Sequence, residues 1–140
     1  MAIGRILRKE GRIAVIRPDD VCVSACVLIL AGAVDRLISG GKVGIHRPYV
    51  GQDSATTAEQ QKTQYVVIEK AIRSYLSEMN IDSRLYDDMF RISPTKVKYL
   101  TSSELRAYGL EGTDPYREQA YYASYAKELG ISTQEPMALP

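Results

Sequence analysis

A continuous apolar segment from Val21 to Val34 constrains the fold of this chain more than any other part of the sequence. It is 14 residues long and is interrupted by Ser24 and Gly32. A helix that crosses the apolar core of a bilayer needs roughly 20 residues, so this segment is too short to span a membrane. Its second half is apolar on every side, which is typical of a helix buried in a protein core. The segment therefore predicts a buried helix with a serine close to its start.

Short extended segments and further helices surround this buried helix. Before it, the pattern predicts a helix over 2–10 and strands over 13–16 and 21–23. After it come extended segments over 36–39 and 42–46, a long helix capped by Thr56 or Thr57, a helix from Asp82 to about Phe90, a short strand over 97–100, a turn of helix capped by Ser102 or Ser103, and a last helix opened by Asp114-Pro115. This mixture of strands and helices is that of an α/β protein.

Length and charge limit the number of domains and the kinds of partner. The chain has 140 residues, of which 45% are hydrophobic and 25% charged, so we expect one domain around one core. Lysine and arginine number 18 against 17 for aspartate and glutamate, and a net charge of +1 provides no broad basic surface for nucleic acid. The first twelve residues lack the apolar core of a secretory signal. We therefore expect no nucleic-acid partner and no membrane-spanning segment, and the sequence indicates no compartment.

Ser24 is the first candidate for chemistry. A serine at a strand-to-helix junction holds its hydroxyl at the positive end of the helix dipole, which is the position of a nucleophile. The backbone N–H of Ala25 would point toward the same place and could stabilise an oxyanion. The alternative is a serine that only caps the helix, and the local sequence by itself favours this capping role.

His46 is the only histidine, and it follows Ser24 by 22 residues at the end of an extended segment. The buried helix of about 11 residues spans roughly 16 Å at ~1.5 Å per residue. The extended segments that return can cover this distance at ~3.3 Å per residue. The imidazole can therefore come back to the Ser24 hydroxyl, although a lone histidine often has a purely structural role.

Five features follow one another in an order that is shared with a known family. They are the helix and strand before the serine, the small-residue junction that carries Ser24, the apolar helix ending in Ala31-Gly32-Ala33 with Arg36 soon after, the segment Gly44-Ile45-His46-Arg47-Pro48, and the late segment Tyr99 to Leu110. In this order they resemble the proteolytic subunit of the Clp protease and its relatives in the crotonase-like superfamily, over roughly residues 2–112. The chain looks most similar to a divergent bacterial branch, often exported, in which the serine lies between two cysteines.

The resemblance implies an α/β fold of the β-β-α spiral type and a serine peptidase that acts on a peptide or protein. It implies Ser24 as nucleophile, His46 as general base and the Ala25 N–H as oxyanion donor. No cofactor is implied. Self-assembly into a homo-oligomer is implied, with subunit contacts made by the helix from Thr57 to Met79. Whether an ATPase partner exists is not indicated by the sequence.

The chain also departs from the family pattern. The glycine pair that supplies half of the family's oxyanion hole, and the strands before it, are missing, so we expect an N-terminally truncated domain over 1–112 with an appended helix and tail over 113–140. The position of the family's catalytic acid is Val97. Asp87 and Asp88 could replace it only if the loop after them shifts, so we expect a Ser24–His46 dyad.

Two other readings of the same fold stay open. The first is a catalytically inactive pseudoenzyme or assembly module, because the glycine pair and the acid are missing. The second, weaker one is a relative of the acyl-CoA-binding crotonases.

Three side chains near the candidate dyad have alternative roles. The spacing of Cys22 and Cys26 permits a disulfide across the junction, but we favour two buried thiols that pack around it. With one histidine and two cysteines we expect no zinc site. Lys70 could serve as the base of a Ser-Lys arrangement like that of signal peptide peptidases, which is a weaker alternative to His46.

Overall fold

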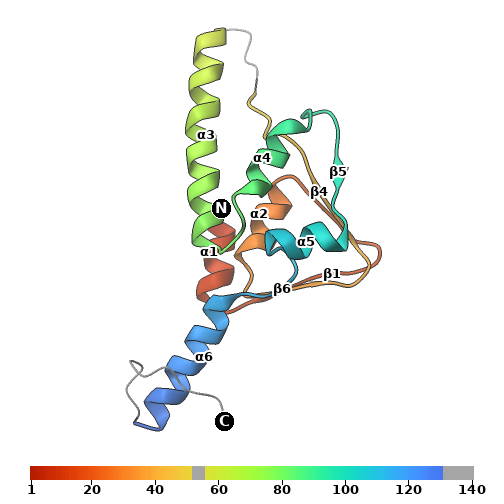
Figure 1. Ribbon diagram of the computed structural model, residues 1–140. Coiled ribbons are helices and arrows are strands. Elements are labelled where there is room, and N and C mark those ends of the chain that lie inside the picture. The colour runs from red at the N-terminus through yellow and green to blue at the C-terminus, as the bar shows by residue number, and fades with distance from the viewer. Residues whose placement is uncertain (52–55, 131–140) are drawn as a thin grey trace.

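Two small sheets and six helices make up the described part of this chain (Figure 1). The computed structural model describes residues 1–51 and 56–130. In chain order the elements are α1 (Ala2–Lys9), β1 (Ile13–Ile16), β2 (Val21–Val23), α2 (Ala25–Gly32), β3 (Asp35–Ile38), β4 (Lys42–Ile45), α3 (Ala58–Glu78), α4 (Arg84–Arg91), β5 (Lys98–Tyr99), α5 (Ser102–Tyr108), β6 (Gly112–Thr113) and α6 (Pro115–Glu128). The predicted α/β class is confirmed.

The two sheets are built from interleaved parallel pairs. One sheet has the order β1-β3-β6 and the other β2-β4-β5, with β1 parallel to β3 and β2 parallel to β4. The chain therefore alternates between the sheets, and α2 belongs to the crossover of both parallel pairs. Parallel strands need such a crossover, because a tight hairpin reverses the chain direction. The short strands β5 and β6 close the sheets in antiparallel orientation.

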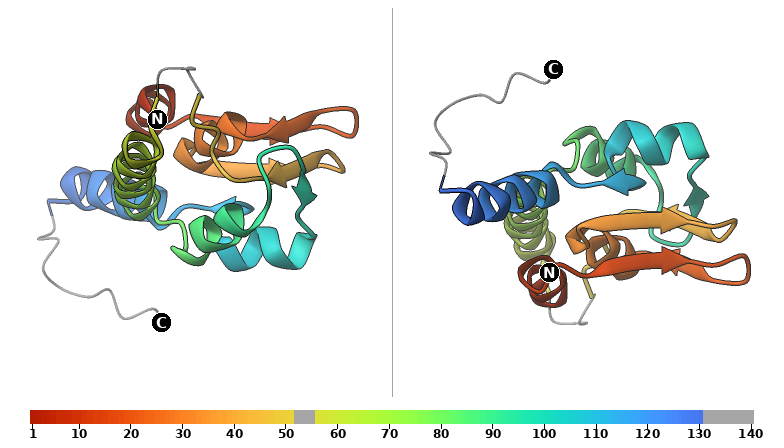
Figure 2. Two further views of the ribbon diagram at one scale, coloured as in Figure 1. Left: turned by 90° about the horizontal axis from the view of Figure 1, so that it is seen from above. Right: turned by 90° about the horizontal axis from the view of Figure 1, so that it is seen from below.

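Helix α2 lies in the core, as its sequence predicted. Val27, Leu30 and Ala31 are at most 2% exposed. Helix α1 crosses α2 where Gly4 faces Gly32, and a Cβ on Gly32 would collide with the backbone of Gly4. Glycine is required at this crossing because the two backbones approach so closely. Figure 2 shows α1 and α2 side by side in views from above and below.

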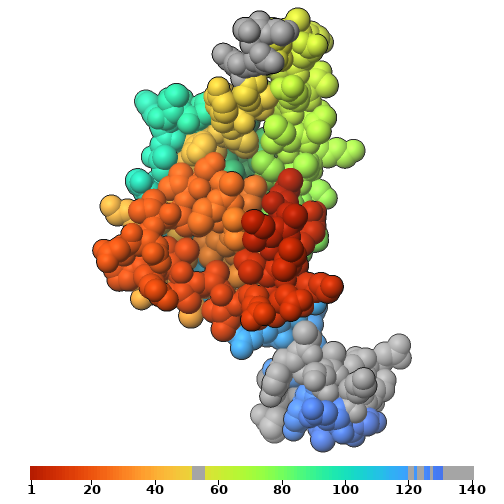
Figure 3. Space-filling view, turned by 180° about the vertical axis from the view of Figure 1, so that it is seen from behind, coloured from red at the N-terminus to blue at the C-terminus, as the bar shows by residue number. Residues whose placement is uncertain are grey.

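Helix α3 is buried only in its second half. Its first turn carries a capping box formed by Thr57 and Gln60, so one of the two predicted caps is confirmed. The buried side chains of this helix are Ile72, Tyr75 and Leu76. The first half extends past the rest of the fold, as Figures 1 and 3 show. No helix in the described ranges is both long and apolar enough to cross a membrane.

Three local predictions were wrong in detail. Helix α5 is capped by Thr101, which forms a capping box with Glu104, and not by Ser102 or Ser103. Helix α4 begins at Arg84, with Ser83 at its N-cap position. The expected cap, Asp82, lies one residue before Ser83, and its carboxylate accepts a hydrogen bond of 2.9 Å from the Arg84 N–H. Strand β6 was not expected, because two residues are too few to produce an alternating pattern.

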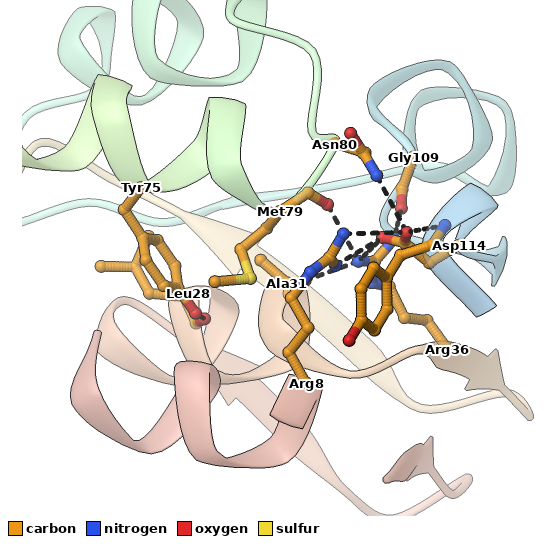
Figure 4. A network of polar contacts seen from close by, with 10 residues as sticks. Arg8, Leu28, Ala31, Arg36, Tyr75, Met79, Asn80, Gly109 and Asp114 are labelled. Atoms are coloured by element: carbon orange, nitrogen blue, oxygen red, sulfur yellow. Dashed lines mark hydrogen bonds and ion pairs between the residues drawn. The ribbon is translucent and has the colours of Figure 1, made fainter. Parts of the chain in front are cut away.

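A polar cluster formed by Arg8, Arg36, Asn80 and Asp114, with Arg36 and Asp114 buried, joins distant parts of the chain (Figure 4). The Asp114 carboxylate accepts hydrogen bonds from Arg36 at 2.7 Å, from Arg8 at 3.0 and 3.2 Å and from Asn80 at 3.0 Å. It also accepts one of 2.8 Å from the backbone N–H of Tyr116 in α6. We call these four residues the Asp114 cluster.

The buried carboxylate of the Asp114 cluster is compensated by its donors, whereas the Nε of Arg36 is buried without a hydrogen-bond partner among the described residues. Burial alone would raise the pKa of Asp114, but the hydrogen bonds from Arg8, Asn80, the Tyr116 N–H and Arg36 outweigh it and lower the pKa. The Arg36 guanidinium additionally donates to the carbonyl oxygens of Ala31, Met79 and Gly109. The cluster therefore fixes the ends of α2, α3 and α5 against the start of α6.

The predicted division of the chain after residue 112 falls inside β6. Asp114, two residues further, is fully buried in the Asp114 cluster. Arg117 in α6 pairs with Asp35 of β3. The predicted tail lies outside the described residues from position 131 onward.

Candidate active site

Ser24 forms the single-residue connection between β2 and α2. Its backbone has φ 61° and ψ −123°. A positive φ is uncommon for a residue with a side chain, because Cβ then approaches the backbone. In the described part of the chain, Asn80 is the other non-glycine residue with positive φ, and asparagine tolerates this conformation well. Ser24 is therefore held in a strained, sharp turn between strand and helix.

The Ser24 hydroxyl does not cap the helix, although Ser24 occupies the N-cap position. No capping hydrogen bond is made by its side chain, whereas Thr57 and Thr101 each accept one from a backbone N–H. The capping role that the local sequence favoured is therefore wrong. The hydroxyl, on a partly exposed residue, is left available for other chemistry.

A disulfide joins Cys22 to Cys26 across this turn, with their Cα atoms 5.2 Å apart. The expectation of two free thiols was therefore wrong. Cys22 is the central residue of β2 and Cys26 the second residue of α2, so the bond ties the strand to the first turn of the helix. We call residues 22–26, closed by this disulfide, the Ser24 turn.

His46 lies directly after β4, the strand that pairs in parallel with β2. In this register Val23 lies opposite Gly44, and the Ser24 N–H donates a hydrogen bond of 3.3 Å to the Gly44 carbonyl. Ser24 and His46 thus leave the sheet at the carboxyl ends of neighbouring parallel strands, where α/β proteins place their sites. Within the described residues no hydrogen bond joins the two side chains. In structures without substrate such catalytic hydrogen bonds are often long and close only in the complex.

The His46 ring is oriented by a backbone carbonyl. Its Nδ1 lies 2.7 Å from the carbonyl oxygen of Arg47. A donor is needed at this contact, which places the proton on Nδ1 and leaves Nε2 free to accept one. Arg47 is itself fixed, because its N–H donates to the Ile92 carbonyl at 2.9 Å and its Nε to the Phe90 carbonyl at 2.8 Å. Sequence reasoning missed this contact, since a main-chain oxygen leaves no signature in the sequence.

The acidic candidates for a third catalytic residue are engaged elsewhere. Asp87 pairs with Arg73 at 2.6 Å, and Asp88 pairs with Arg91 at 2.9 Å and accepts a hydrogen bond from Tyr108. The interaction with Asp88 contributes, after burial, to the raised pKa of Tyr108.

The other candidates near the dyad give no further catalytic group. Val97 is the position at which the family that the sequence resembles has its catalytic acid. Its apolar side chain lies over Gly44 of β4, where a Cβ would overlap it. Lys70 is exposed on α3. Among the described residues, no three His, Cys, Asp or Glu side chains gather as a metal site would require.

Two neighbouring strand ends provide groups that a nucleophilic site would need. They are a hydroxyl with no hydrogen-bond partner among the described residues, an imidazole whose Nε2 can accept a proton, and the Ala25 N–H in the first turn of α2, where backbone N–H groups have no helical acceptor. A hydroxyl, a base and an oxyanion donor are the parts that acyl transfer needs.

Comparison with known proteins gives a likeness in fold to a solved structure. No family model matches the chain, and no curated protein sequence does. Among solved structures, the fold matches the 1510-N membrane-bound stomatin-specific protease, in a Ser-to-Ala mutant form, with a TM-score of 0.52 and 20% sequence identity. The match covers 78% of this chain and 53% of that protein, so the chain spans about half the length of this structural neighbour.

This likeness shows that the chain shares the fold of part of that protease. It agrees with the α/β class, and the Clp protease and crotonase type that the sequence resembles stays a prediction. The divergent branch and the full spiral arrangement stay predictions.

Proposed function

We propose that this chain is a serine-type peptidase that cleaves peptide bonds with a Ser24–His46 dyad and uses the Ala25 N–H as an oxyanion donor. The observation that carries the proposal is the Ser24 turn, in which a serine at a strand-to-helix junction has positive φ and a hydroxyl that caps nothing. A strained serine turn of this kind presents the nucleophile of many hydrolases. The shared fold of a serine protease adds to this argument.

In the proposed mechanism His46 acts first as a base and then as an acid in each half-reaction. Ser24 Oγ attacks the carbonyl carbon of the peptide bond while His46 Nε2 takes the hydroxyl proton. The oxyanion that forms accepts a hydrogen bond from the Ala25 N–H. His46 then gives its proton to the leaving amine, and water cleaves the acyl-serine ester by the same steps. No cofactor takes part.

The Arg47 carbonyl takes the place of the catalytic acid in this proposal. In a Ser-His-Asp triad the acid accepts the Nδ1–H of the histidine and holds its tautomer and orientation. A neutral carbonyl at 2.7 Å from Nδ1 can do both, but it stabilises the imidazolium less than a carboxylate does. We therefore expect a slower enzyme than one with a full triad.

A fluorophosphonate probe tests the nucleophile directly. The purified chain is labelled and the adduct located by peptide mass mapping, with Ser24→Ala and His46→Ala as test variants and Ser103→Ala, an exposed serine of α5, as matched control. We expect an adduct on Ser24 that both test variants abolish and the control keeps. Folded protein that forms no adduct would contradict the proposal and favour the inactive assembly module.

We also propose that α3 makes contacts between copies of the chain. Val66 and Val67 in its extended first half are 59% and 63% exposed, and exposed apolar surface that forms a contiguous patch marks interaction sites. Light scattering on the intact chain and on Val66→Lys tests this, and a monomer at high concentration would contradict it.

A further inference from the structure

The disulfide between Cys22 and Cys26 has no role in the proposed mechanism, yet it surrounds the nucleophile. The ring that it closes contains three further residues, which are Ser24 and its two neighbours, Val23 and Ala25. The bond links the two elements whose relative position sets the backbone angles of Ser24. A disulfide at this place therefore acts directly on the conformation of the Ser24 turn.

Two backbone hydrogen bonds hold Ser24 itself. The Ser24 N–H reaches the Gly44 carbonyl at 3.3 Å, which is long for this type of hydrogen bond, and the Val27 N–H donates to the Ser24 carbonyl at 3.0 Å. The side chain contributes no hydrogen bond to the start of α2, while Cys22 and Val27 on either side are buried in the core. A strained backbone conformation persists only where its surroundings over-determine it. The disulfide adds a covalent constraint to this packing, and it is the part of the surroundings that a reductant can remove.

Two other helix starts show which backbone conformation a residue with a hydroxyl group adopts at an N-cap without such a constraint. Thr57 and Thr101 precede α3 and α5 with φ near −75° and ψ near 160°, and each side chain accepts a hydrogen bond from the N–H three residues on. A released Ser24 has the same option at the Val27 N–H. In that state its hydroxyl is bound to the helix and turned away from the position of a nucleophile.

We propose that the Cys22–Cys26 disulfide is a redox-controlled positioning device, which holds Ser24 in its reactive conformation when oxidised and releases it to an inactive helix-capping conformation when reduced. The proposal rests on the function proposed above and assigns a regulation to the same site. Cys26 is the point of access, since it is partly exposed whereas Cys22 is 1% exposed.

The reductant is a dithiol, and the exchange proceeds in two steps. One thiolate attacks Cys26 Sγ, the Sγ–Sγ bond breaks, and its electron pair remains on Cys22 Sγ, which takes up a proton. The second thiolate attacks the reductant's own sulfur in the mixed disulfide and releases Cys26 as a thiolate that is protonated. The dithiol leaves as a cyclic disulfide, so two electrons and two protons have passed to the protein.

The test compares the rate at which the fluorophosphonate labels Ser24 before and after reduction by dithiothreitol, with the redox state checked by intact mass. We expect reduction to lower the rate about tenfold to a hundredfold, the range typical of a misplaced catalytic group, and reoxidation to restore it. The Cys22→Ala/Cys26→Ala double variant should label at the slow rate with and without dithiothreitol. If it does not fold, Cys26→Ala alone, at the more exposed position, replaces it. Equal rates in fully oxidised and fully reduced protein would overturn the proposal.

Hydrogen exchange provides a readout that does not need activity. We expect reduction to change exchange over residues 22–27 and to leave α5 unchanged. Exchange that rises in α5 as well would show a general loss of stability and overturn the positioning role. If the probe labels neither redox state, the peptidase proposal fails, and hydrogen exchange then decides the positioning proposal. A change in exchange confined to residues 22–27 supports the positioning role, and unchanged exchange overturns it.

Discussion

Ser24 and Asp114 both precede a helix, but they use their oxygens in opposite ways. Asp114 is fully buried and accepts hydrogen bonds from Arg8, Arg36, Asn80 and the backbone N–H of Tyr116. The Ser24 hydroxyl accepts no capping hydrogen bond, and the residue holds a strained backbone conformation. One helix start therefore contributes stability, while the other gives stability up and keeps a reactive group free. Such a contrast is expected if Ser24 belongs to the proposed site, since activity often conflicts with the best packing.

The largest loss of stability is expected when Asp114, the buried residue of the two, is replaced. Asp114→Ala leaves the guanidinium groups of Arg8 and Arg36 without their anion, and loss of one partner of a buried ion pair costs about 3–5 kcal/mol. Urea unfolding followed by circular dichroism measures the change. Asp114→Asn, which keeps the shape and loses the charge, is the control and should lie in between. A loss below about 1 kcal/mol for the alanine variant would show that the cluster is not the anchor described here.

Acid should reproduce part of this loss. The pKa of Asp114 is lower in the folded chain than in the unfolded one, so the folded state binds fewer protons and its extra stability is present above the ordinary carboxyl range. As pH falls through the folded pKa, this stability is lost. We expect the free energy of unfolding of the wild type to fall steeply with acidification, and that of Asp114→Asn to fall less. Parallel pH profiles for the two proteins would contradict the assignment.

A smaller effect is expected at an ordinary helix cap. Thr101→Ala removes the acceptor for the Glu104 N–H and should cost about 1 kcal/mol of stability. Labelling of Ser24 should stay unchanged, because Thr101 belongs to α5 and not to the site. Ser103→Ala, which removes a hydroxyl of the same helix without a capping role, should be nearly neutral in the same denaturation experiment.

The smallest effect, of opposite sign, is expected at Ser24 itself. Ser24→Gly removes the Cβ that makes positive φ unfavourable, and we expect a gain of up to about 1 kcal/mol after the greater flexibility of glycine in the unfolded chain is subtracted. Ser24→Ala keeps the Cβ and should be close to neutral. The thermal midpoints of both variants check this prediction. If both lost as much stability as Thr101→Ala, Ser24 would be an ordinary cap and the contrast would disappear.

The sequence predicted those parts of the fold that rest on local patterns. The burial of α2 was predicted from an apolar segment that has no polar face. The cap of α3 was predicted from the threonines that precede an amphipathic segment. Ser24 and His46 were placed at the ends of extended segments, which is where β2 and β4 bring them. Their catalytic roles remain a prediction.

Other features could not be obtained from the sequence, for physical reasons. The pairing of Arg36 with Asp114 joins residues 78 positions apart, and no periodicity signals such a contact. Whether Cys22 and Cys26 can form a disulfide depends on a Cα distance that only the fold provides. The positive φ of Ser24 is set by the elements on both sides of it, whereas local preference alone favours a cap.

The separation of contacts along the chain also bears on the order in which the molecule assembles during synthesis. The strands that present Ser24 and His46 lie within residues 21–45, whereas the hydrogen bonds of Asp114 to Arg8 and Arg36 span 106 and 78 residues. Contacts between distant residues form late, because a longer loop must close first. On the ribosome, both arginines emerge well before their carboxylate. The site can therefore take shape early, while the core is closed by a residue close to the last helix.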